Sequence, residues 1–81
     1  MTADEMFKKL GFEKYEYKEY PFVSYIKEMD KPQSLCIDFY LDKKEYGAHY
    51  EFDARDRIAA HVNMKENKAI QMKLKELGWL E

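Results

Sequence analysis

Two stretches of the chain alternate strictly between apolar and polar residues, and this alternation constrains the fold more than any other feature. Leu35, Ile37, Phe39 and Leu41 alternate with Cys36, Asp38 and Tyr40, and Tyr46, Ala48, Tyr50 and Phe52 alternate with Gly47, His49 and Glu51. A period of two is typical of β-strands that have one face buried. We therefore predict two neighbouring, half-buried strands over 35–41 and 46–52.

The short segment between these strands predicts how they pair. If Lys43-Lys44 is a two-residue loop, apolar residues meet across the whole pair. The predicted pairs are Leu41–Tyr46, Phe39–Ala48, Ile37–Tyr50 and Leu35–Phe52. A slip of one residue would turn one strand's apolar side chains to the other face, so the pattern favours this register. The loop lacks the Asn-Gly or Asp-Gly sequence that is usual in two-residue hairpins.

Three other segments also have the composition of strands. The segment 22–29 is rich in large apolar residues and ends at a turn containing Pro32. The segment 13–18 is heavily charged, which is typical of an edge strand protected against unwanted pairing. Ile58, Ala60 and Val62 alternate and predict a short last strand.

Both ends of the chain carry the start and stop residues of helices. Thr2 with Glu5, and Asn63 with Glu66, have the spacing of a capping box, in which each side chain bonds the other residue's backbone. Apolar residues follow each pair at helical spacing. Gly11 and Gly78 then end the two helices, and Phe12 and Trp79 are expected to fold back onto them.

Together these elements predict an α+β fold. We expect an antiparallel β-meander of four to five strands, with a short N-terminal helix and a longer C-terminal helix packed on one face. The length of 81 residues corresponds to a single domain.

Charge and cysteine content limit the classes of partner and the location. The chain has 14 basic and 16 acidic residues, and the net charge of −2 gives no global electrostatic reason to bind nucleic acid or an anionic membrane. Cys36 is the single cysteine, whereas small secreted domains usually depend on disulfides. The N-terminus is too charged for a signal peptide, and no stretch approaches a membrane span. We therefore expect a cytoplasmic domain with no membrane partner.

An excess of apolar surface is the best-supported functional feature. The predicted strand over 22–29 carries large apolar side chains on both of its faces, so one set cannot join the core. Phe22 and Ile26, with Tyr40 beside them and Met72 on the second helix, would form an exposed apolar surface of the kind that binds a partner. That partner is another protein or, in a homodimer, a second copy of the chain. The alternative is that helix or loop segments cover these residues.

Nucleic-acid binding is a second hypothesis. Lys65, Lys68 and Lys75 follow one side of the second predicted helix, and Arg55 and Arg57 lie in the turn before it. Such a stripe could contact phosphates. Acidic residues interrupt it, so a solvated helix face is the preferred interpretation.

A third hypothesis is a metal or acid–base site on the sheet. In the predicted registers Asp38 lies opposite His49, and His61 lies on the other side of His49, so that the three form a row across three strands. An aspartate can orient an imidazole, and two histidines with a carboxylate can hold a metal ion. Cys36 would lie opposite Glu51, which raises a thiol's pKa and disfavours a role as nucleophile.

No sequence motif indicates a phosphate-binding loop, a Cys-x-x-Cys pair or a nucleophilic serine, so we expect a non-catalytic domain without a cofactor.

The chain opens with Asp4-Glu5-Met6-Phe7 through Leu10-Gly11-Phe12-Glu13-Lys14 and closes with Asn67-Lys68-Ala69-Ile70 through Glu76-Leu77-Gly78-Trp79. With its tyrosine-rich strands, this pattern resembles the small uncharacterised proteins of Gram-positive bacteria and their prophages. The resemblance implies an αβ-meander-α fold and an intracellular location, and it transfers no site residues.

Overall fold

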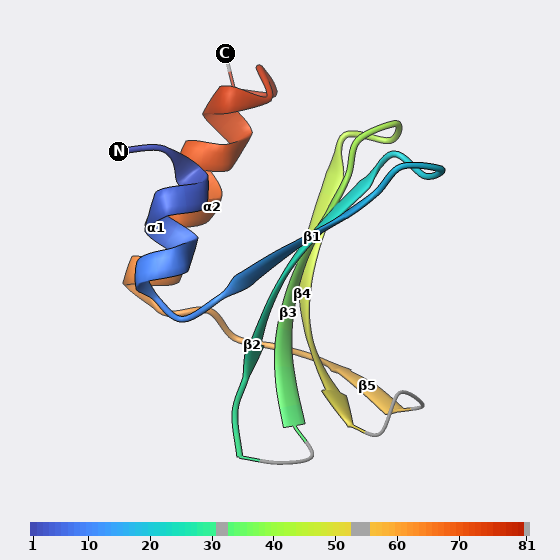
Figure 1. Cartoon of the computed structure of the whole chain (residues 1–81), viewed down its shortest axis with the longest axis vertical. Helices are drawn as coiled ribbons and strands as arrows, with labels where there is room; N and C mark the ends of the chain where they lie inside the picture. The colour runs from blue at the N-terminus through green and yellow to red at the C-terminus, as the bar shows by residue number, and fades with distance from the viewer. Residues whose placement is uncertain (31–32, 53–55, 81) are drawn as a thin grey trace.

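The computed structural model describes residues 1–30, 33–52 and 56–80, and in it two helices lie on the same side of a five-stranded sheet (Figure 1). The elements in chain order are α1 (Ala3–Lys9), β1 (Glu13–Tyr17), β2 (Phe22–Glu28), β3 (Gln33–Tyr40), β4 (Glu45–Phe52), β5 (Asp56–Ala59) and α2 (Met64–Glu76). The strands are antiparallel and follow one another across the sheet in the order β1-β2-β3-β4-β5. The predicted α+β meander with one helix from each end of the chain is confirmed.

Both helices begin at the predicted capping boxes. Thr2 Oγ1 accepts from the Glu5 N–H at 3.2 Å, and Glu5 Oε1 accepts from the Thr2 N–H at 2.9 Å. The same reciprocal pair joins Asn63 and Glu66, with both distances at 2.8 Å. These bonds satisfy backbone donors that a helix start otherwise leaves without partners.

Both helices also end at the predicted glycines. Gly11 and Gly78 have φ values of 94° and 75°, a conformation that costs a residue with a side chain about 1–2 kcal/mol. The residue after each glycine donates its N–H to the last helical turn at 3.0 Å, Phe12 to Phe7 and Trp79 to Leu74. This is the Schellman ending, used twice. Within the described residues, neither helix combines the length and apolar character needed to cross a membrane.

The core lies between the helices and the inner face of the central strands. The sheet contributes Val23, Tyr25, Leu35, Ile37 and Phe39, and the helices contribute Ala3, Phe7, Ala69, Ile70 and Leu74. The Phe7 ring stacks on Tyr25, with centroids 4.0 Å apart. Burying a large apolar side chain contributes about 1.5–3 kcal/mol, so these residues hold both helices on one face.

The pairing of β3 with β4 is shifted by two residues from the prediction. The observed inner-face pairs are Phe39–Tyr46, Ile37–Ala48 and Leu35–Tyr50. The turn therefore spans residues 41–44 and not Lys43-Lys44 alone. A two-residue hairpin turn favours glycine or asparagine because its central residues need positive φ. The longer turn needs a positive φ only at Lys44, where φ is 55°. Among the described non-glycine residues, no other has a positive φ. Because the shift is even, each side chain keeps its predicted face.

The pairing of β4 with β5 also differs by two residues from the prediction. Ala59, and not His61, lies opposite His49, and β5 ends at this pair. The predicted strand continued to residue 62. The chain leaves the sheet earlier because it must cross to the helical layer, where α2 begins at Met64 (Figure 1). Val62 still packs, partly buried, against the core.

Candidate functional site

The tips of two hairpins enclose an open depression lined by aromatic side chains. We call it the aromatic hollow. It has a volume of about 420 Å³ and is lined by Tyr17, Tyr20, Pro21, Phe22, Tyr40, Asp42 and Lys43. The β1–β2 turn supplies one wall and the β3–β4 turn the other, and the two tips lie side by side at the end of the sheet (Figure 1).

One backbone hydrogen bond joins the two turns, and a second lies within the β1–β2 turn. The Leu41 N–H donates to the Pro21 carbonyl at 2.8 Å, and the Phe22 N–H donates to the Tyr20 carbonyl at 2.8 Å. Since the β2–β3 register places Phe22 opposite Tyr40, their rings lie 5.2 Å apart, centroid to centroid. The Tyr17 ring continues the row, 5.3 Å from Phe22. Three strands thus contribute one continuous run of aromatic rings.

The hollow is accessible and nearly uncharged. Tyr20 is 67% exposed and Tyr17 is 47% exposed. Asp42 and Lys43 are the charged residues in its lining, and their charges cancel. The tyrosine hydroxyls can both donate and accept hydrogen bonds. Such a surface suits an apolar ligand that also carries hydrogen-bond acceptors.

The structure divides the surface predicted around Phe22, Ile26, Tyr40 and Met72. Phe22 and Tyr40 are neighbours in the aromatic hollow, as expected. Ile26 pairs with Cys36, four residue pairs further along the sheet, and lines a different, polar depression. Met72 lies on α2 and is packed, partly buried, against the core. The predicted single patch of four residues is therefore not formed.

Sequence reasoning missed the contributions of Tyr17, Tyr20 and Pro21. The segment 18–21 is the turn between β1 and β2, but it contains no glycine or asparagine that would mark it as one. The available signal was Pro21, which cannot donate to a sheet ladder and so favours a strand boundary.

A row of polar side chains crosses the outer face of the sheet, and it begins with Ser24 and Asp38, two residues along their strands from Phe22 and Tyr40 of the hollow. Asp38 Oδ1 accepts from the Ser24 hydroxyl at 2.6 Å, and Asp38 Oδ2 lies 3.2 Å from His49 Nδ1. Ser24 and Asp38 are both buried, at 3% and 4% exposure. The predicted contact between Asp38 and His49 is therefore formed, although diagonally across the strand pair, because Gly47 lies directly opposite Asp38.

His49 also faces two further side chains with metal-ligating atoms. Its Nε2 lies 3.4 Å from Glu51 Oε2, which in turn lies 4.0 Å from Cys36 Sγ. One ligand atom from each of Cys36, His49 and Glu51 falls within 4.8 Å of the other two. Burial, with Glu51 and then Asp38 adding to it, raises the pKa of the Cys36 thiol to about 11. The free thiol is therefore a poor nucleophile at neutral pH, as expected.

His61 does not join this row. It lies two residues beyond the end of β5 and is exposed, whereas Ala59 occupies the position opposite His49. The predicted Asp38–His49–His61 set is wrong for that reason. The predicted β4–β5 register was shifted by two residues, so it put His61 at the position opposite His49 that Ala59 occupies.

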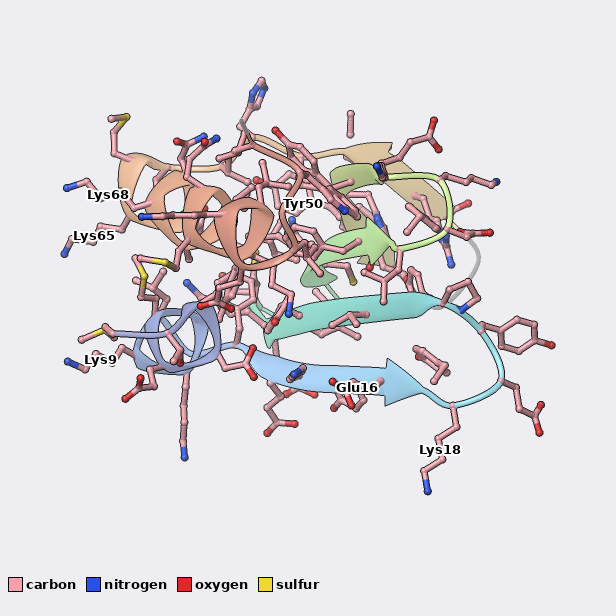
Figure 2. All side chains as sticks on the ribbon, turned by 90° about the horizontal axis from the view of Figure 1, so that it is seen from above. Lys9, Glu16, Lys18, Tyr50, Lys65 and Lys68 are labelled. Carbon is pink, nitrogen blue, oxygen red and sulfur yellow. The ribbon has the colours of Figure 1, made fainter. Side chains whose placement is uncertain are left out.

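The predicted nucleic-acid residues lie on separate elements. Arg57 is on β5, with its Nε 3.8 Å from Glu51 Oε2, while Lys65, Lys68 and Lys75 are exposed on α2. Arg55 lies outside the described residues. Figure 2 shows Lys65 and Lys68 beside Lys9 of α1, at the end of the molecule opposite Lys18. These lysines are thus at the far end from the aromatic hollow.

Comparison of the chain with protein-family models, with curated proteins and with solved structures found no significant match.

Proposed function

We propose that this chain is a non-catalytic protein-binding domain that holds an extended, proline-containing segment of a partner protein in the aromatic hollow. The observation that carries the proposal is the open run of rings from Tyr17 through Phe22 to Tyr40, with Tyr20 67% exposed beside it. The volume of about 420 Å³ falls within the range of ligand-binding clefts.

The chemistry of the hollow favours an extended proline-containing segment. Such a segment adopts the polyproline II conformation, which has no internal hydrogen bonds and leaves its carbonyl oxygens free. Aromatic grooves bind these segments by packing rings against prolines. The hydroxyls of Tyr17, Tyr20 and Tyr40 supply donors for the free carbonyls. The balanced charges of Asp42 and Lys43 provide no attraction for a highly charged ligand.

A titration with a short oligoproline peptide, followed by amide chemical shifts, tests the proposal. We expect shifts confined to the β1–β2 and β3–β4 turns and a saturable binding curve. Tyr20→Ala should weaken binding roughly tenfold or more, because exposed aromatic residues at the centre of an interface dominate its affinity. Tyr20 is not in the core, so this variant should keep the fold.

Tyr15→Ala provides the matched control. Tyr15 lies on β1 and, like Tyr20, is an exposed tyrosine, with 43% exposure, but it does not line the aromatic hollow. The Tyr15→Ala variant should therefore bind the peptide with unchanged affinity. Equal effects of Tyr15→Ala and Tyr20→Ala, or equal binding of a glycine-serine peptide of the same length, would refute the proposal. A concentration-dependent dimer that Tyr20→Ala dissociates would identify a second copy of the chain as the occupant instead.

We also propose that the domain works in the cytoplasm. Its one cysteine, Cys36, is a free and buried thiol. A fold of this size without a disulfide is typical of a reducing compartment.

A further inference from the structure

We infer that Cys36, His49 and Glu51 bind a divalent transition-metal ion of the zinc class on the outer face of the sheet. The three side chains project from β3 and β4, with Cys36 directly opposite His49. Their ligand atoms are a thiol sulfur, an imidazole nitrogen and a carboxylate oxygen, all within 4.8 Å of one another. This mixed set suits zinc, whereas calcium and magnesium take oxygen ligands.

Two of the three separations between ligand atoms are close to those of tetrahedral coordination, and the third, between Cys36 and His49, is within 4.8 Å. With zinc bonds of about 2.3 Å to sulfur and about 2.1 Å to nitrogen and oxygen, a tetrahedron separates nitrogen from oxygen by about 3.4 Å and sulfur from oxygen by about 3.6 Å. His49 Nε2 lies 3.4 Å from Glu51 Oε2, and Cys36 Sγ lies 4.0 Å from the same oxygen. Only a small rotation of the Cys36 or Glu51 side chain is needed to close the second distance.

Asp38 orients the imidazole for this role. It lies 3.2 Å from His49 Nδ1, so the neutral ring that donates to Asp38 presents its lone pair at Nε2, toward Cys36 and Glu51. Ser24 donates to the other oxygen of Asp38 at 2.6 Å and fixes the carboxylate in turn. A carboxylate behind a ligating histidine is the usual outer shell of a zinc site. Asp38 and Ser24 are thus positioning residues.

The charges of the site balance once an ion is bound. A divalent ion neutralises the Cys36 thiolate and the Glu51 carboxylate, while Arg57 beside Glu51 offsets Asp38. Coordination by Cys36 displaces the thiol proton to solvent, since the ligand is the thiolate. The side chains of His49 and Glu51 remain 17% and 29% exposed, which leaves an entry path and a fourth position for water.

Cobalt substitution provides the test. Titrating Co²⁺ into the purified full chain should give one equivalent of binding, the d–d absorption bands of tetrahedral cobalt and a thiolate-to-cobalt charge-transfer band. Added Zn²⁺ should displace the cobalt and abolish the bands. Absence of stoichiometric binding, or a spectrum without the charge-transfer band, would overturn the inference.

Variants assign the ligands. Cys36→Ser should abolish the charge-transfer band, and Glu51→Gln, at a partly exposed position, should weaken binding without affecting the fold. Asp38→Asn should reduce the affinity roughly 10- to 100-fold while keeping the spectrum, as expected of a positioning residue. His61→Gln is the matched control, because it removes the other, exposed histidine, and it should change nothing. Unchanged cobalt binding in Glu51→Gln, or its loss in His61→Gln, would overturn the assignment.

Discussion

At the scale of single residues, Asp4 links α1 to the sheet. Its Oδ1 accepts from the Tyr25 hydroxyl at 2.6 Å and its Oδ2 from Lys14 Nζ at 2.9 Å. Burial alone would raise the pKa of Asp4, but the hydrogen bonds from Lys14 and Tyr25 outweigh it and lower the pKa below the ordinary value of 3.8. Burial of the ring, and then the hydrogen bond to Asp4, raise the pKa of Tyr25, so its hydroxyl stays a donor.

This lowered pKa predicts how stability depends on pH. A carboxylate with a lower pKa in the folded state stabilises the fold above its unfolded pKa, and the contribution is lost as pH falls through the folded pKa. Because the Asp4 side chain is 46% exposed, solvent screens its contacts. Asp4→Asn should therefore cost about 0.5 kcal/mol at neutral pH, and the difference should shrink below pH 3.8. Urea unfolding of both proteins across this range measures it. Asp42→Asn, in the exposed β3–β4 turn, is the control, and a pH-independent difference would contradict the prediction.

At the scale of elements, the sequence predicts faces more reliably than registers. The alternation over 35–41 and 46–52 correctly identifies which side chains point to the helices, because that depends only on odd or even position. Register depends on the turn, and nothing in Leu41-Asp42-Lys43-Lys44 shows that Lys44 takes the left-handed conformation. The helix ends were predictable to the residue, since capping boxes and terminal glycines act locally.

The left-handed Lys44 makes the β3–β4 turn suboptimal. A positive φ of 55° costs a lysine about 1–2 kcal/mol, which glycine avoids at an entropic cost of about 0.5–1 kcal/mol. Lys44→Gly should therefore stabilise the protein by about 0.5–1 kcal/mol in urea unfolding. Lys43→Gly, which gains no relief of strain, should be neutral or destabilising. A loss of stability in Lys44→Gly equal to that in Lys43→Gly would show that the turn is not strained at this residue.

The dependence of register on turns also decided how much of the aromatic hollow and of the polar row could be predicted. Phe22 and Tyr40 were correctly expected to lie beside each other because both lie in regular strands. Tyr17 and Tyr20 join them through a turn that the sequence does not mark. The contact between Asp38 and His49 survived the register error because the shift moved it to a diagonal neighbour. In the observed register Cys36 lies opposite His49, which brings the ligand atoms of Cys36, His49 and Glu51 together.

At the scale of the whole molecule, the first and last helices close the fold. The Ala3 N–H, at the start of α1, donates to Glu76 Oε2, in the last turn of α2, at 2.8 Å. Ala3 is fully buried, and a buried donor left without a partner costs about 1–3 kcal/mol. This bond is therefore a long-range link between residues 73 positions apart in the sequence.

Replacing Glu76 measures the strength of this link. Glu76→Ala removes the acceptor and should lower the free energy of unfolding by about 1–2 kcal/mol, because the Ala3 amide is left unsatisfied. Glu76→Gln keeps a carbonyl oxygen and should recover most of the loss. Urea unfolding compares the variants, and hydrogen exchange at the Ala3 amide reports the bond directly. If the Ala and Gln variants were equally stable, the bond would not contribute.

For the peptide binding proposed above, the hydrogen bond from Leu41 to the Pro21 carbonyl would bear on both kinetics and affinity. It fastens the two hairpin turns to each other before any ligand arrives, so neither wall of the aromatic hollow needs to be ordered on association. Pre-organisation of this kind reduces the entropic penalty of complex formation. A peptide would then meet a receptor whose shape is already set, and its residence time would depend on the contacts with the rings, not on the closing of a loop.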